Sequence, residues 1–199
     1  MKEDQLTFDP QTHIYRLNDV PIPSVTQIMQ PLSRHKYRDI DEETLNHAAE
    51  RGTAVHSAIE FYDRYGLDEC EEKARPYFEA YLAWHRQYKP QVISNEQITW
   101  HKNLLYAGTV DMLAEIGDKV TLVDFKTTAT ISDMLTTVQL EAYRRALETH
   151  GVDIQQKAIL QLKPDGTYTW KTYRVKDLEA WQTFAALITI RYHIIDYGG

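Results

Sequence analysis

Hydrophobic residues recur along the chain at two spacings, and these divide it into helical and extended segments. Apolar or small side chains three to four positions apart predict helices over about 42–65, 71–88, 132–150 and 177–195. Gly66, Pro90 and Gly151 provide natural stops for the first three. Runs rich in β-forming residues predict strands over about 91–100, 105–116, 119–128, 157–162 and 168–175.

The N-terminal part has a pattern of shorter elements. Residues 6–23 predict a small hairpin around Asp9-Pro10. Ser24 is placed to cap a short helix that starts at Val25, and the polar, basic residues 31–40 predict a loop or a short helix. A helix that joins two groups of strands indicates an α/β fold, with a mixed sheet covered by helices on its faces. We expect one domain over 1–199, with an N-terminal hairpin and helical roof (1–90) and a mixed-sheet core (91–199).

Two of the predicted strands carry paired carboxylates. If Gly117-Asp118 is a two-residue hairpin loop, the register places Asp111 directly opposite Asp124. Facing Cβ atoms lie roughly 4.5–5.5 Å apart, so two carboxylates there repel and lose hydration. A divalent cation removes both penalties, and Mg²⁺ and Mn²⁺ prefer oxygen ligands. Lys126 projects from the same strand face as Asp124. The alternative is a hairpin whose polar residues are simply solvated.

Other polar residues lie on predicted helices. His56 borders the apolar stripe of the 42–65 helix, with Gly52 one turn before it and Glu60 one turn after. A glycine inside a helix costs about 1 kcal/mol relative to alanine, so close approach of a backbone or ligand would explain Gly52. Gln139 and Tyr143 share a helix face. Taken separately, these are also compatible with an ordinary helix histidine and a half-exposed helix boundary.

Composition and charge exclude several classes. Cys70 is the single cysteine, so there is no disulfide framework and no cysteine-ligated cluster or zinc site. The net charge of −7 argues against a protein that coats nucleic acid through bulk electrostatics, although a metal site can invert the local field. The first residues do not form a signal peptide, and no apolar run approaches the roughly 20 residues that span a membrane. We expect a cytoplasmic protein without a membrane partner.

Together these residues resemble a known family. His56, Asp111, Asp124-Phe125-Lys126 and Gln139-X-X-X-Tyr143, in this order and spacing, resemble the PD-(D/E)XK nuclease superfamily. The resemblance is closest to its RecB-like exonuclease branch, including phage-type and mitochondrial-type single-strand exonucleases, and it covers most of 6–145. It implies a restriction-endonuclease-like core. Because the four-cysteine iron–sulfur cluster of the CRISPR-adaptation nucleases needs ligands that this chain lacks, that cofactor is excluded.

The resemblance also implies roles for individual residues. His56, Asp111, Asp124 and the carbonyl of Phe125 would bind one or two Mg²⁺ or Mn²⁺ ions. Lys126 would act with the two aspartates in catalysis, and Glu96 or Glu60 would hold a second ion or act through water. The residues expected to contact DNA are Gln139, Tyr143, Arg51, Arg34, Lys36 and Arg144, although the arginines and the lysine could equally be solvated surface charges.

The predicted function is a metal-dependent DNA exonuclease. It would hydrolyse phosphodiester bonds of single strands or strand ends in phage or bacterial DNA recombination, repair or processing. DNA is the expected partner, with a recombination or single-strand-binding protein as a second one. The alternatives are a structure-specific DNA endonuclease and a catalytically inactive DNA-binding homologue.

Overall fold

A mixed five-stranded sheet forms the centre of the computed structural model, which describes residues 4–197 and the side chains up to 194. The strands lie side by side in chain order, β4 (Gln91–Trp100), β5 (Ala107–Glu115), β6 (Val120–Lys126), β7 (Gln156–Leu162) and β8 (Tyr168–Tyr173). Only β6 and β7 pair in parallel, as a crossover through a helix requires. That helix is α5 (Asp133–Glu148), and the α/β fold predicted from the sequence is confirmed.

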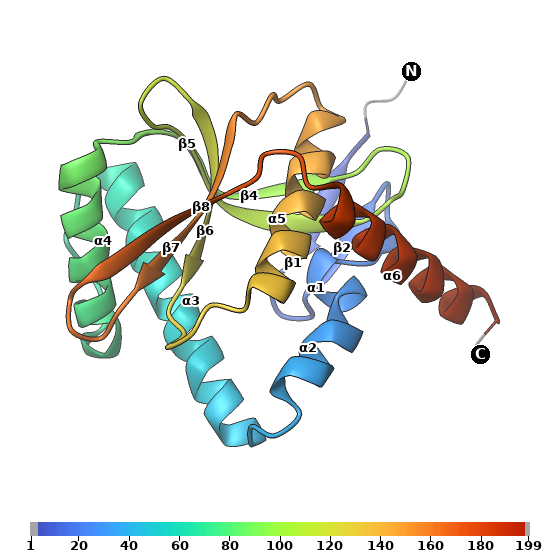
Figure 1. The fold of residues 1–199 in the computed structure, drawn as a ribbon, viewed down its shortest axis with the longest axis horizontal. Helices are drawn as coiled ribbons and strands as arrows, with labels where there is room; N and C mark the ends of the chain where they lie inside the picture. The colour runs from blue at the N-terminus through green and yellow to red at the C-terminus, as the bar shows by residue number, and fades with distance from the viewer. Residues whose placement is uncertain (1–3, 198–199) are drawn as a thin grey trace.

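Helices cover both faces of the sheet, and each face has its own core (Figure 1). On one face, α1 (Val25–Ile28), α5 and α6 (Leu178–Tyr197) pack on residues such as Leu122. On the other face, α3 (Glu42–Tyr65) and α4 (Arg75–Tyr88) pack on residues such as Val123. Adjacent strand residues therefore enter opposite cores, which explains why the central strands are apolar without alternation.

The N-terminal segment forms a second, three-stranded sheet rather than the predicted hairpin. Its strands are β1 (Leu6–Asp9), β2 (Ile14–Leu17) and β3 (Val20–Ile22). The hairpin prediction missed β3 because that strand is only three residues long, contains Pro21 and has two exposed positions. Asn18 and Asp19, with φ of 51° and 68°, make the left-handed turn that β3 needs. Ser24 caps α1 as predicted, accepting the backbone N–H of Gln27.

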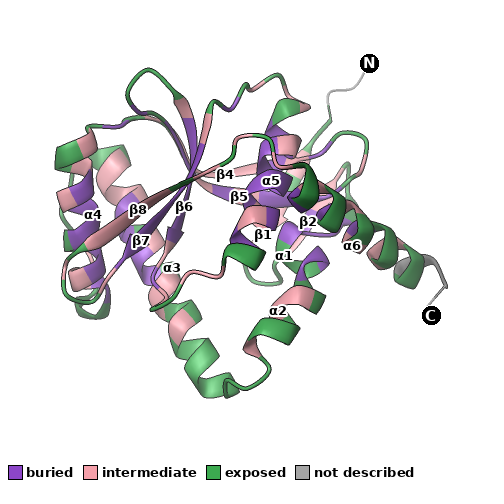
Figure 2. Ribbon diagram, viewed as in Figure 1, coloured by how far each residue is buried: buried purple, intermediate pink, exposed green. Residues whose placement is uncertain are grey.

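The long helix α3 has the predicted bounds, and Gly66 ends it with φ of 70°. Only its second half packs on the sheet. The segment 31–40 is largely helical, as α2 (Gln30–Tyr37). The first turns of α3 meet α2 away from the sheet, and both are largely exposed (Figures 1 and 2). Leu45, assigned to the apolar stripe, is therefore 37% exposed. We call this projection of residues 30–50 the α2–α3 arm.

The remaining boundaries differ from the predictions by a few residues. The segment 71–88 begins with a short 3₁₀ turn (Glu72–Ala74) before α4, and Lys89 ends α4 with φ of 47°. Over the described residues, no helix combines the length and apolar character needed to cross a membrane.

Candidate active site

The β5–β6 hairpin has the predicted register. The ladder pairs Glu115 with Val120 and continues to Met112 with Val123. Gly117 and Asp118 form the two-residue loop, and both have positive φ, as a type I′ turn requires. Asp111 and Asp124 lie one step past the last ladder pair, Met112 with Val123. There Oδ2 of Asp111 accepts the backbone N–H of Phe125 at 2.7 Å, which ties the two strands together beside the site.

Three side chains from three elements form a cluster suited to a cation. His56 comes from α3, Glu96 from β4 and Asp111 from β5, and one potential ligand atom of each lies within 4.8 Å of the others. Nδ1 of His56 is 2.9 Å from Oε1 of Glu96 and 3.8 Å from Oδ1 of Asp111. Opposite ligands of Mg²⁺ lie about 4.2 Å apart, so a small closure of the cluster would fit one ion. The sequence placed His56 and Asp111 here and gave Glu96 only a secondary role.

The second aspartate belongs to a neighbouring group. Asp124 is 2% exposed, and its Oδ2 lies 2.7 Å from Nζ of Lys126. Lys126 also donates to Oε1 of Gln139 on α5 at 3.1 Å. Tyr143, one turn further along α5, is also buried. The lysine is thus held between the carboxylate of Asp124 and the amide of Gln139.

Burial and close charges shift the proton equilibria of the site. Burial raises the pKa of Asp111, and it raises the pKa of Asp124 to about 6. Burial disfavours the charged form of His56, but Asp111 and Glu96 outweigh it and raise the pKa of His56 to about 9. Burial likewise opposes the charge on Lys126, yet Asp124 raises the pKa of this lysine above its ordinary value. At this pKa His56 is protonated at neutral pH, and a cation bound by this residue would have to displace that proton.

This proton makes metal binding depend on pH. If His56 is a ligand, the affinity for Mn²⁺ should rise about tenfold per pH unit between about pH 6.5 and 8.5, because binding releases one proton below its pKa of about 9. Isothermal titration calorimetry at several pH values, in buffers of different ionisation enthalpy, measures both affinity and proton release. In His56→Gln the affinity should be lower and nearly independent of pH over this range. A flat profile for the wild type would contradict ligation by His56.

The site residues line a cavity of about 650 Å³. Its walls come from α3, the ends of β5 and β6, α5 and the N-terminal sheet. Tyr15 on β2 fixes the N-terminal sheet to this wall through a 2.7 Å hydrogen bond with Thr109. A second cavity of about 240 Å³ adjoins the first, since Thr26, Lys126 and Gln139 line both. The wall that Thr109 and Tyr15 share could not be predicted, because residues so far apart in the chain leave no periodic signal.

Gly108 is required by the close approach of Tyr143. A Cβ at residue 108 would lie 2.6 Å from Cε1 of Tyr143, whereas a Cβ at Gly52 would meet only Oγ1 of Thr127, at 3.9 Å. Among the described residues, no backbone from outside its own helix therefore approaches Gly52 closely, although this residue does line the cavity.

Substitution of these two glycines by alanine should change the stability of the protein in opposite directions. Gly108→Ala should destabilise the protein by about 1–3 kcal/mol, because the Tyr143 ring must shift. Gly52→Ala should stabilise it by about 0.5–1 kcal/mol, because an alanine lowers the entropy cost of the helix without a clash. Urea denaturation of both variants measures the difference. Equal effects would show that the contact with Tyr143 does not constrain residue 108.

The predicted DNA contacts fall into different environments. Arg34 and Lys36 are exposed on the α2–α3 arm. Arg51 donates to the carbonyl of Thr127 at 3.3 Å.

Glu60 lines the main cavity and forms an ion pair with Arg64 at 2.7 Å. Phe125 is buried between the two charged residues of β6, and its ring packs edge-on against His56.

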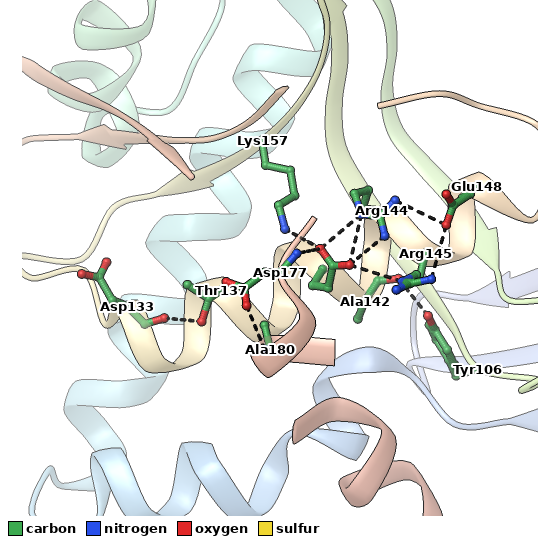
Figure 3. A network of polar contacts seen from close by, with 11 residues as sticks. Tyr106, Asp133, Thr137, Ala142, Arg144, Arg145, Glu148, Lys157, Asp177 and Ala180 are labelled. Atoms are coloured by element: carbon green, nitrogen blue, oxygen red, sulfur yellow. Dashed lines mark hydrogen bonds and ion pairs between the residues drawn. The ribbon is translucent and has the colours of Figure 1, made fainter. Parts of the chain in front are cut away.

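The prediction that Arg144 contacts DNA is wrong. Its side chain is 3% exposed and its guanidinium donates to the fully buried Glu141, to which Lys157 also donates (Figure 3). Tyr106 in the same region donates to the carbonyl of Ala142. An arginine enclosed in this way cannot reach a phosphate, and the helical periodicity alone did not distinguish it from a surface arginine.

Comparison with known proteins identifies the class. A family model of the PD-(D/E)XK nuclease superfamily matches residues 64–190, a range that contains Glu96, Asp111, Asp124 and Lys126 but begins after His56. The chain belongs to this superfamily, which confirms the resemblance seen in the sequence. The superfamily uses divalent metal ions, and the match supports a nuclease activity.

Two solved structures are similar to this chain. The crystal structure of an alkaline exonuclease (LHK-Exo) from Laribacter hongkongensis is 13% identical over 87% of each chain, with a TM-score of 0.47. The structure of LHK-Exo in complex with dAMP is 12% identical over 88% of each chain, with a TM-score of 0.41. Comparison with curated proteins gives no match.

Proposed function

We propose that this protein is a Mg²⁺- or Mn²⁺-dependent deoxyribonuclease of the RecB-like branch, acting as an exonuclease on single strands or strand ends. The observation that carries the proposal is one cavity in which the cluster of His56, Glu96 and Asp111 lies beside the Asp124–Lys126 pair. Four carboxylates line this cavity, those of Glu60, Glu96, Asp111 and Asp124. Lys126, the protonated His56 and the Arg64 partner of Glu60 offset only part of this charge, so a phosphate would still be repelled unless a further cation compensated the rest.

The cluster supplies the donor set for such a cation. Two carboxylates and an imidazole suit Mn²⁺ and are acceptable to Mg²⁺, and the chain offers no second cysteine that would favour a softer metal. His56, Glu96 and Asp111 would hold the ion, with Asp124 and the carbonyl of Phe125 as further ligands of one or two ions. When bound, a divalent ion lowers the pKa of water and neutralises charge on a phosphate.

Lys126 is the residue that would act directly on the reacting groups. Asp124 and Gln139 hold its ammonium at 2.7 and 3.1 Å, so its long side chain is fixed before substrate arrives. The raised pKa of Lys126 keeps it protonated. A fixed ammonium at this point would orient an attacking water or stabilise the negative charge that develops on the phosphate. Gln139 and Tyr143 would then set the position of the DNA through Lys126 and the cavity wall.

The two adjoining cavities provide space on both sides of Lys126. A strand whose phosphate lies at the metal cluster could place a neighbouring nucleotide in the second cavity, which is lined by Ser33 and Tyr37 of the α2–α3 arm. Arg34 and Lys36 of the arm, together with Arg51, would contact backbone phosphates. In this proposal residues 1–199 form one nuclease domain, with 1–90 as the roof that favours strand ends.

The proposal includes a biological setting for the enzyme. The enzyme would act in the cytoplasm, in phage or bacterial DNA recombination, repair or processing, with a recombination or single-strand-binding protein as partner. The residues Phe8-Asp9-Pro10, Tyr15 and Pro23-Ser24-Val25-Thr26 resemble the N-terminal part of phage-encoded members, and this resemblance supports the setting.

Linear and covalently closed circular single-stranded DNA, with and without Mn²⁺, test the proposal. The expected result is Mn²⁺-dependent degradation of 5′- or 3′-labelled linear strands, loss of activity in EDTA, and an intact circle. Efficient cutting of the circle would overturn end dependence and favour an endonuclease. Equal, negligible activity of the wild type and Asp124→Ala on every substrate would reject the nuclease proposal in favour of an inactive DNA-binding homologue.

A further inference from the structure

Two consecutive residues of β4 bond to the same helix. Nδ2 of Asn95 donates to Oδ2 of Asp63 on α3 at 2.6 Å, and Oε1 of Glu96 lies 2.9 Å from Nδ1 of His56, also on α3. In a regular strand, consecutive side chains point to opposite faces of the sheet. A regular β4 could therefore direct only one of these two side chains toward α3.

The backbone of Glu96 resolves this conflict. Its φ is +47°, a left-handed conformation inside a strand, and glutamate has no special preference for it. The ladder with β5 pairs Asn95 with Met112 and Gln97 with Val110, on either side of this residue. Glu96 thus lies at the ladder position that faces Asp111, and its left-handed turn brings its carboxylate and the Asn95 amide to the same helix. Such a conformation persists only when its surroundings hold it.

Asp63 is well placed to hold it. Asp63 and His56 lie about two helical turns apart on α3, so they share a helix face. The hydroxyl of the fully buried Tyr81 donates to Oδ1 of Asp63 at 2.5 Å, which anchors this carboxylate to α4. Oδ1 of Asn95 is buried without a partner among the described residues, so the hydrogen bond to Asp63 is the contact that orients this amide.

We propose that Asp63 and Asn95 are positioning residues that hold Glu96 in its left-handed conformation and thereby complete the cation cluster. Neither residue lines the cavity, so both act through Glu96. This inference deepens the proposed function and rests on it, since the site it completes is the proposed metal site.

Asn95→Asp tests the pair, because it places a second carboxylate against Asp63. We expect its affinity for Mn²⁺, measured by calorimetry, to fall about 10- to 100-fold, the usual cost of losing an outer-shell partner. Combining it with Asp63→Asn reverses the hydrogen bond while the introduced amide oxygen still accepts from Tyr81, so the double variant should recover most of the affinity. Ile59→Val, a core change on α3 between His56 and Asp63, is the control for lost stability and should bind Mn²⁺ like the wild type.

A double-mutant cycle separates positioning from a general structural effect. If Asn95 acts through Glu96, Asn95→Asp should cause no further loss of Mn²⁺ affinity in a Glu96→Ala background. An additive loss, or no loss from Asn95→Asp alone, would overturn the proposal.

A metal-free measurement keeps this inference distinct from the proposed function. The ¹³Cα and ¹³Cβ chemical shifts of Glu96 should report a left-handed residue in the wild type, an extended one in Asn95→Asp and a left-handed one again in the double variant. If the wild type bound no Mn²⁺ but showed these shifts, the proposed function would fail while the positioning of Glu96 stood. Left-handed shifts in Asn95→Asp would reject the positioning role.

Discussion

Asp111→Asn is expected to lower Mn²⁺-dependent DNA cleavage by about 10³-fold or more while the protein stays folded. The amide oxygen can still accept the N–H of Phe125, so the link between β5 and β6 remains. The other carboxylate oxygen, which faces His56 at 3.8 Å, is replaced by an NH₂ group that cannot bind a cation. A loss of about 4 kcal/mol of transition-state stabilisation corresponds to this factor. Initial rates on end-labelled single strands measure it.

The thermal stability of this variant should be unchanged or slightly higher. Burial raises the pKa of Asp111, which means that the ionised form is costly there and a neutral amide is tolerated. Asp118→Asn is the matched control, an identical substitution at the exposed turn of the same hairpin, where φ of +62° suits asparagine. It should leave cleavage unaffected. A folded Asp111→Asn protein within tenfold of the wild-type rate would show that this carboxylate is not essential to the site.

The parts of this site that local chemistry determines could be predicted from the sequence. Gly117-Asp118 sets the register of β5 and β6, because a two-residue loop leaves only one pairing, and that places Asp111 and Asp124 near each other. The bounds of α3 follow from Asp41 as N-cap and Gly66 as its left-handed end. These signals lie within a few residues of the element that they define.

The parts that depend on distant contacts could not be predicted. Glu96 looks like an ordinary strand residue, but it has φ of +47°, its carboxylate bonds to His56, and its neighbour Asn95 donates to Asp63, both on another element. The cluster contains Glu96, whereas the prediction from the sequence put more weight on Asp124 as a ligand. Arg144 was misassigned because its side chain is buried in the fold, where its helix neighbour Glu141 also accepts from the distant Lys157 of β7.

Substitution of the buried Glu141 is expected to have the largest effect on stability. Glu141 is fully buried and accepts from Arg144 at 2.7 Å and from Lys157 at 2.6 Å, while the N–H of Asp177 before α6 lies 3.4 Å from the same carboxylate (Figure 3). One carboxylate thus joins α5, β7 and the start of α6. Removing one partner of a buried ion pair leaves uncompensated charge, so Glu141→Gln should lower the free energy of unfolding by about 3–5 kcal/mol.

Urea denaturation of Glu141→Gln, beside Glu148→Gln, measures this effect. Glu148 lies on the same helix and contacts the same Arg144 at 3.3 Å, but its side chain is 47% exposed, so its loss should cost no more than about 1 kcal/mol. Burial opposes ionisation of Glu141, yet Arg144 and Lys157 together lower its pKa below the ordinary value of 4.5. Its contribution is therefore fully present above pH 4.5 and is lost as the pH falls through the lowered pKa of the folded state. The difference in the free energy of unfolding between the wild type and Glu141→Gln should therefore become smaller only at acidic pH. If the two substitutions lowered the free energy of unfolding equally at neutral pH, the buried Glu141 network would contribute no more to stability than a surface ion pair.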